Sequence, residues 1–102
     1  MWYTKFNLKK REGNISCPSC ESTKEEEIFY SLDLVKCEVC NSDNVFMRTI
    51  NYIYVFAIEE APITFKAIYQ QVKTKPLKEA YSELLKSSEV FNDELKNDIP
   101  NE

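Results

Sequence analysis

The chain has 102 residues and a formal net charge of −4, and it is 43% hydrophobic and 29% charged, values typical of one small soluble domain with its own core. An acidic chain is a poor starting point for non-specific DNA binding, because the affinity of such binding comes from neutralising phosphates. No stretch reaches the ~18 consecutive apolar residues of a membrane span, and the N-terminus lacks a secretory pattern. We therefore expect a cytoplasmic protein in a reducing environment, with a single domain over residues 1–102.

The first sixty residues are predicted to form an antiparallel β-sheet. Residues 2–8 alternate apolar and polar side chains as a short strand does, and a turn centred on Gly13 and Asn14 follows. Two short strands are expected between the cysteine pairs. The strongest strand signal covers residues 45–58, where β-branched and aromatic residues follow one another. Its aromatic side chains are expected to fill the core rather than to stack on bases: Tyr52, Tyr54 and Phe56.

The pattern becomes helical after Ala61 and Pro62, where the proline interrupts the strand. Apolar residues recur at helical spacing from Phe65 to Val72, and Pro76 marks the start of a second helix of about twenty residues. The sequence thus predicts an α+β protein: a β region at 1–60, a helical region at 61–97 and a frayed tail at 98–102.

The four cysteines of the chain form two pairs with the spacing Cys-x2-Cys-x16-Cys-x2-Cys: Cys17, Cys20, Cys37 and Cys40. Two intervening residues let both thiolates of a pair reach one ion, and the longer segment lets the second pair return on a hairpin, as tetrahedral zinc requires. The chain has no His, and four thiolates leave no open position for water or substrate. One structural Zn²⁺ is therefore predicted. An iron–sulfur cluster, disulfides or redox pairs are the alternatives.

The two Cys-x2-Cys turns, CPSC and CEVC, with strands expected between and after them, make residues 15–58 resemble the zinc ribbon superfamily. The resemblance implies that the four cysteines are the ligands, and such folds occur in transcription, replication and ribosomal proteins and in phage or viral regulators. We call each turn a knuckle. Glycine often follows the second cysteine of a zinc-ribbon knuckle, whereas this chain has Glu21 and Asn41. Because Glu adopts a left-handed backbone only at a cost, we expect an irregular first knuckle.

Three functional hypotheses follow. The leading one is a small zinc adaptor that binds a protein of transcription or other nucleic-acid machinery, of the kind that a phage or virus encodes. The second is direct DNA or RNA binding through basic residues: Lys5, Lys9, Lys10, Arg11 and Arg48. The third is an antitoxin-like or structural subunit that forms a homodimer through one helix face: Leu77, Tyr81, Leu84, Phe91 and Leu95.

An enzyme is not expected, because the sequence has no His base, no Ser/His/Asp set and no Gly-rich phosphate loop. The acidic run Glu25–Glu27 between the cysteine pairs argues against phosphate contact there, and it favours a protein partner.

Overall fold

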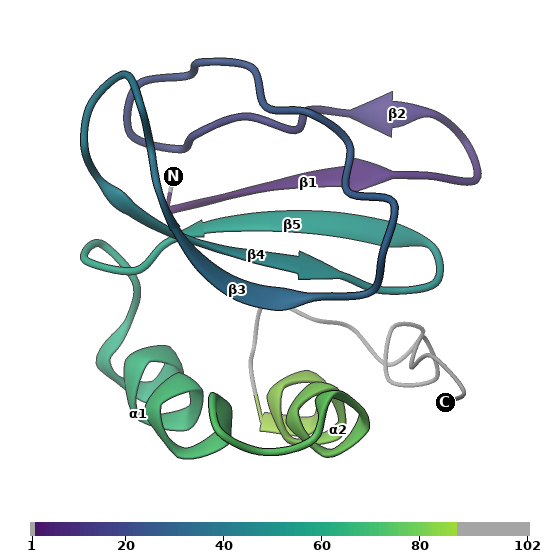
Figure 1. Ribbon diagram of the computed structural model, residues 1–102, viewed down its shortest axis with the longest axis vertical. Helices are drawn as coiled ribbons and strands as arrows, with labels where there is room; N and C mark the ends of the chain where they lie inside the picture. Colours follow the sequence, from purple (N-terminus) through teal and green to yellow (C-terminus); the bar gives the residue numbers. More distant parts are fainter. Residues whose placement is uncertain (1, 88–102) are drawn as a thin grey trace. The chain divides into compact units, whose positions relative to one another are not determined.

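The computed structural model describes residues 2–87, and the chain divides after Ala61 into two compact units (Figure 1). The first unit, Met1–Ala61, contains a five-stranded antiparallel sheet, and the second begins at Pro62 and contains two helices. The predicted α+β fold is confirmed. The division between the units lies one residue from the predicted boundary between the β region and the helical region. The predicted frayed tail lies outside the described residues.

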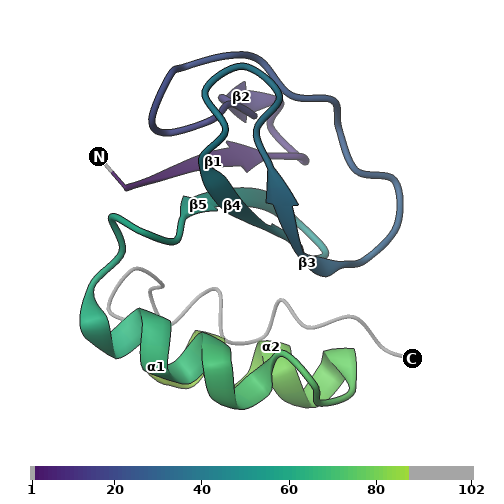
Figure 2. The same ribbon diagram turned by 60° about the vertical axis from the view of Figure 1, so that its left-hand side comes forward.

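The strands of the sheet lie in the order β2-β1-β5-β4-β3, and all neighbouring strands are antiparallel. The first strand of the chain thus pairs with the last one, and β3 forms an outer edge, as Figure 2 shows. The bounds are Tyr3–Asn7 for β1, Glu12–Gly13 for β2, Leu32–Lys36 for β3, Asp43–Arg48 for β4 and Tyr52–Ala57 for β5.

The single long strand predicted at 45–58 is wrong, because the structure has two strands there, β4 and β5, joined by a tight turn. The apolar and aromatic run crosses this turn without a Gly or Pro to mark it. Thr49 makes the turn instead. Its backbone N–H donates to Tyr52 O at 2.9 Å, and its buried Oγ1 accepts from the Tyr52 N–H at 3.1 Å.

The segment between the two knuckles also differs from the prediction. Of the two strands expected there, only β3 is present, together with one isolated bridge between Ser16 and Thr23. Residues 24–31 have no helix or strand. The acidic run Glu25–Glu27 within this segment has low strand propensity, which accounts for the missing strand.

The core of the first unit is formed by β4 and β5. Successive residues of both strands are buried, so apolar side chains fill both faces of the sheet, as the continuous apolar run predicted. The rings of Tyr52 and Tyr54 stack with centroids 5.8 Å apart, and those of Tyr54 and Phe56 at 5.5 Å. Tyr54 and Phe56 are buried, which agrees with the expectation of a core role.

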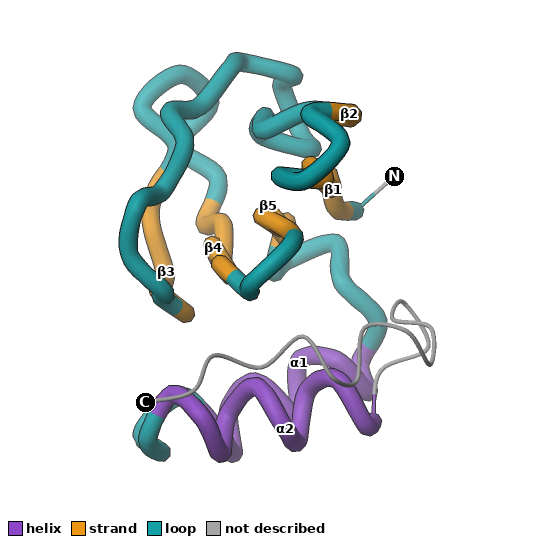
Figure 3. The backbone as a smooth tube through the Cα atoms, turned by 90° about the vertical axis from the view of Figure 1, so that its right-hand side faces the viewer, coloured by secondary structure: helices purple, strands orange, loops and turns teal. Residues whose placement is uncertain are grey.

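The second unit is a pair of helices, α1 (Ile63–Val72) and α2 (Leu77–Ser87), which contact each other and lie side by side (Figure 3). Proline starts α2 as predicted, since the Ala80 N–H donates to Pro76 O at 3.0 Å. The two helices bury one apolar stripe each: Phe65, Tyr69 and Val72 on α1, and Ala80, Tyr81, Leu84 and Leu85 on α2. Within residues 2–87, no helix is long and apolar enough to cross a membrane.

Candidate metal centre

The first knuckle is closed by two backbone hydrogen bonds. The Cys17 N–H donates to Ser22 O at 2.9 Å, and the Glu21 N–H donates to Cys17 O at 2.8 Å. The second knuckle repeats both bonds at the matching positions: Cys37 N–H to Ser42 O at 2.8 Å and Asn41 N–H to Cys37 O at 2.9 Å. The two turns therefore have one shape, although the residues between their cysteines differ.

Both knuckles use a left-handed residue directly after the second cysteine. Glu21 has φ 63° and Asn41 has φ 62°. The expectation of an irregular first knuckle is therefore wrong. The two backbone bonds impose the left-handed conformation whatever the side chain, and for Glu21 that conformation costs about 1–2 kcal/mol.

The four sulfur atoms come together, and all lie within 4.8 Å of one another. Cys17 Sγ is 3.6 Å from Cys40 Sγ, and Cys20 Sγ is 3.7 Å from Cys37 Sγ. A tetrahedral site with metal–sulfur bonds of about 2.3 Å has sulfur–sulfur edges of about 3.8 Å. All four are free thiols. The cluster thus has the composition and size to hold one metal ion.

The two knuckles share a hydroxyl two residues after the second cysteine. Ser22 Oγ lies 3.2 Å from Cys20 Sγ, and Ser42 Oγ lies 3.2 Å from Cys40 Sγ. A hydroxyl can donate to a thiolate and so stabilise its charge. These two serines were not predicted as part of the site. The signal that could have found them is the repeated pattern Cys-x2-Cys-x-Ser, CPSCES and CEVCNS.

A lysine also contacts the cluster. Lys24 Nζ donates to Cys37 Sγ at 3.1 Å, and this contact raises the pKa of Lys24. The Cys40 backbone N–H, the Lys24 ammonium and the Ser22 hydroxyl together lower the pKa of Cys37 from 9.0 to about 5. Lys24 is held there by its own backbone N–H, which donates to Ile15 O at 2.8 Å.

Asn44 on β4 brings a buried amide to Cys17. Burial raises the pKa of Cys17, but the Asn44 side chain and backbone N–H groups lower it more, and the net shift is downward. Asn44 is 1% exposed, yet its amide atoms complete no hydrogen bond of ordinary length within the described residues. A charged thiolate on a metal is the acceptor that such an amide would stabilise, so the surroundings fit a metal held by sulfur.

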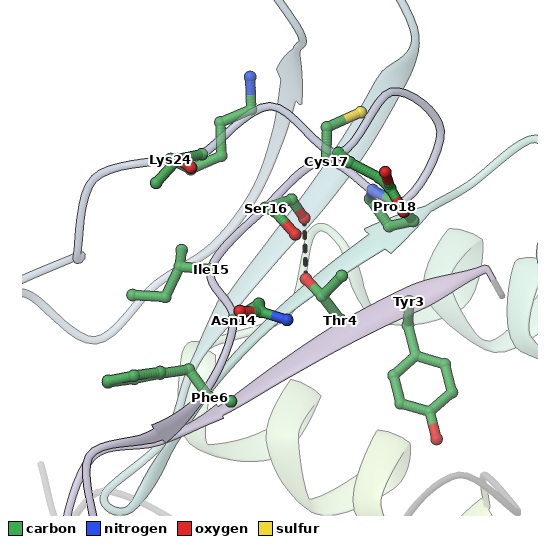
Figure 4. Close-up of a pocket in the computed structure, with 12 residues that line it drawn as sticks. Tyr3, Thr4, Phe6, Asn14, Ile15, Ser16, Cys17, Pro18 and Lys24 are labelled. Carbon is green, nitrogen blue, oxygen red and sulfur yellow. Dashed lines mark hydrogen bonds between the residues drawn. The ribbon is translucent and has the colours of Figure 1, made fainter.

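The sheet positions both knuckles. The second knuckle is itself the connection between β3 and β4. The first knuckle is tied to β1, where Thr4 Oγ1 donates to Ser16 O at 2.8 Å (Figure 4). Figure 4 also shows the pocket beside this knuckle, which Tyr3 and Phe6 of β1 line together with Cys17 and Lys24.

The five basic residues proposed for nucleic-acid contact do not form one surface. Lys5 lies opposite Tyr54, and Tyr54 lies opposite Met47, so these three side chains share one face of the sheet. Arg48 follows Met47 in β4 and therefore points to the other face.

The remaining basic residues lie in the turn after β1. Arg11 pairs with Glu26 at 3.1 Å, and its guanidinium lies over the ring of Phe6. Lys9 and Lys10 are exposed. The positive charge of Arg11 is thus partly offset by an acidic neighbour within the first unit.

The helix face proposed for dimerisation is largely internal where it is described. Tyr81 and Leu84 are buried, and Leu77 is half-buried. The other two residues of that face, Phe91 and Leu95, lie outside the described residues.

Comparison with known proteins adds no relative. No protein-family model, no curated protein and no solved structure matches this chain. The metal-binding geometry of the four cysteines is therefore the feature on which the function is argued.

Proposed function

We propose that this protein is a zinc-ribbon-like adaptor: one structural Zn²⁺ holds its β unit together, and the protein acts by binding a partner. The observation that carries the proposal is the cluster of four thiols within 4.8 Å of one another. Tetrahedral sulfur sites are typical of zinc and of iron–sulfur centres. The close spacing supports a single ion, because a multi-iron cluster sits between its thiolates and holds them further apart.

The charges around the cluster also support zinc. Four thiolates and one Zn²⁺ carry a net charge of −2, and the Lys24 ammonium beside Cys37 reduces it to −1. The hydroxyls of Ser22 and Ser42 add hydrogen bonds to the sulfurs. With all four coordination positions occupied by protein, the ion would stabilise the fold and leave no position for a substrate.

The adaptor role rests on what surrounds the metal. The zinc-ribbon resemblance points to a partner in transcription or other nucleic-acid machinery, and the small, Gly-poor chain suits a phage- or virus-encoded regulator. Direct nucleic-acid binding has less support, since Lys5 and Arg48 lie on opposite faces and Arg11 is paired with an acid. The homodimer also has less support, since Tyr81 and Leu84 are buried within the chain.

Metal analysis of the protein purified under reducing conditions tests whether the four cysteines bind zinc. We expect one zinc per chain, and a cobalt-substituted protein should have the absorption spectrum of a tetrahedral tetrathiolate site. Cys17→Ser should lower the metal content, whereas Ser19→Ala should not, because Ser19 is an exposed knuckle residue that is not a ligand. Bound iron, or a protein that melts at the same temperature after chelation, would refute the structural zinc.

Binding assays separate the adaptor from the two alternatives. Direct nucleic-acid binding predicts an affinity that falls steeply with salt and is lost when Lys9, Lys10 and Arg11 are neutralised. We expect no oligonucleotide binding even at low salt. We also expect a solution mass of 12.0 kDa, the mass of one chain. A doubled mass would favour the homodimer instead.

A further inference from the structure

The β3 strand has an open edge. It is the last strand of the sheet on its side and pairs only with β4. The Arg48 N–H donates to Ser31 O, and the Cys37 N–H donates to Ser42 O, so the odd-numbered residues of this stretch face β4. By the alternation of an antiparallel ladder, the N–H and C=O groups of the even-numbered residues face outward: Leu32, Leu34 and Lys36. No backbone hydrogen bond from another described residue reaches this outer side.

Large apolar side chains are exposed on β3 and in the segments that directly precede and follow it in the chain. Leu34 and Val35 on the strand are 54% and 41% exposed, and Val39 in the second knuckle is 69% exposed. Ile28 and Phe29, in the irregular segment that leads into β3, are 79% and 74% exposed. We call this set the β3 apolar edge: Ile28, Phe29, Leu34, Val35 and Val39. Exposed apolar side chains along an unpaired sheet edge favour a binding surface, because such an edge can pair with another chain.

The charge around the β3 apolar edge is strongly negative. Residues 25–38 contain five acidic residues and one basic residue, Lys36; the acids are Glu25, Glu26, Glu27, Asp33 and Glu38. The adjoining metal centre would add negative charge at Cys37. Such a surface repels phosphates and attracts a chain that carries Lys or Arg.

The same charge argues against a second copy as the occupant. Two copies that paired through β3 about a two-fold axis would bring their acidic segments together, and the like charges would repel each other. A basic partner segment meets no such repulsion, and an extended one can use the outward backbone groups of Leu32, Leu34 and Lys36.

We propose that a basic, extended segment of a partner protein adds a strand to the sheet at β3 and places apolar side chains against the β3 apolar edge. This inference rests on the proposed adaptor function and specifies the surface and chemistry of the partner. Backbone bonds to β3 give affinity, and alternate side chains of the added strand give selectivity for Lys or Arg beside apolar residues.

A random twelve-residue peptide library, selected on the metal-loaded protein, tests the proposal. We expect enriched peptides in which basic residues accompany β-branched or aromatic ones, and their affinity should fall as salt rises. Addition of an enriched peptide should shift the amide NMR signals of Leu32, Leu34 and Lys36. Enrichment of acidic peptides, no enrichment at all, or shifts confined to α1 and α2 would overturn it.

Three variants define the surface. Leu34→Pro removes one outward N–H and leaves the hydrogen bonds with β4 intact. It should lower the affinity for an enriched peptide about tenfold. Phe29→Ser should lower this affinity by a similar factor. Because Phe29 lies outside the strands, this variant tests the surface even if Leu34→Pro folds poorly. Ile63→Ser is the matched control, an 84% exposed apolar residue on α1, and it should leave the affinity unchanged. Equal binding by all three would overturn the proposal.

Metal content and solution mass are measured for each protein. A zinc-loaded monomer that selects no basic peptide refutes the docking surface alone, whereas a protein without zinc refutes the proposed function. A dimer that Leu34→Pro converts to a monomer would show that a second copy occupies β3, and this too overturns the proposal.

Discussion

At the scale of single residues, the thiol of Cys37 is distinguished by its neighbours. Its pKa is lowered to about 5 by the Cys40 backbone N–H, by Lys24 and by Ser22. These neighbours favour the thiolate, which is the form that a metal ion binds. Because the pKa is lower in the folded state, this thiolate stabilises the fold above the usual thiol range, and the stabilisation is lost as the pH falls through about 5.

The contact between Lys24 and Cys37 can be tested on the zinc-bound protein, in which both knuckles are folded. We expect zinc to be released in one step as the pH falls, because protons compete with the metal for the thiolates. Lys24→Met should move this step to higher pH, because it removes the cation beside the sulfur. Lys36→Met, which changes an exposed lysine on β3, is the control and should leave the step in place. A step that does not respond to Lys24→Met would contradict the assigned contact.

Glu21 and Asn41 form a matched pair of left-handed residues, with φ 63° and 62°. Glu21→Gly should raise the free energy of unfolding of the metal-bound protein by about 1 kcal/mol, since glycine takes this conformation without strain. Asn41→Gly should raise the free energy of unfolding by less, because Asn already tolerates the left-handed conformation. Urea unfolding of the two variants tests the order, and a destabilised Glu21→Gly would contradict it.

At the scale of elements, the strands and helices that could be predicted are those with a local signal in the sequence. Pro76 marks the start of α2, and the alternation of residues 2–8 marks β1. The β4–β5 turn was missed because it depends on one Thr49 side chain within an apolar run. The four ligands were found because their spacing is local, whereas Asn44 meets Cys17 only because the fold brings the first knuckle beside β4.

The β1–β2 hairpin requires a glycine at position 13, and Gly13 is the single glycine of the chain. It has φ 105° and lies opposite Phe6, and an added Cβ would clash with the carbonyl oxygen of Lys5. Gly13→Ala should therefore lower the free energy of unfolding by about 1–3 kcal/mol. Glu12→Ala, at the exposed neighbouring position, should change it by less than about 0.5 kcal/mol. Thermal or urea unfolding measures both, and equal effects would contradict the clash.

At the scale of the whole molecule, all four ligands belong to the first unit and none to the second. Removal of the metal should therefore destabilise the first unit more than the second. Chelation should abolish hydrogen-exchange protection in the two knuckles and β3, with smaller changes in α1 and α2. A loss of even 2 kcal/mol lowers the melting temperature of a domain of this size by roughly 8–16 °C. A uniform loss of protection over both units would contradict this division.

The second knuckle has a consequence for how metal and partner act together. Lys36 ends β3 and Cys37, the next residue, is a metal ligand, so the two binding events act on one continuous stretch of backbone. Coupling between two binding events is reciprocal. If zinc orders β3 for its partner, then the bound partner must strengthen zinc binding by the same factor. The protein would thus release its metal to a chelator most readily when it is alone.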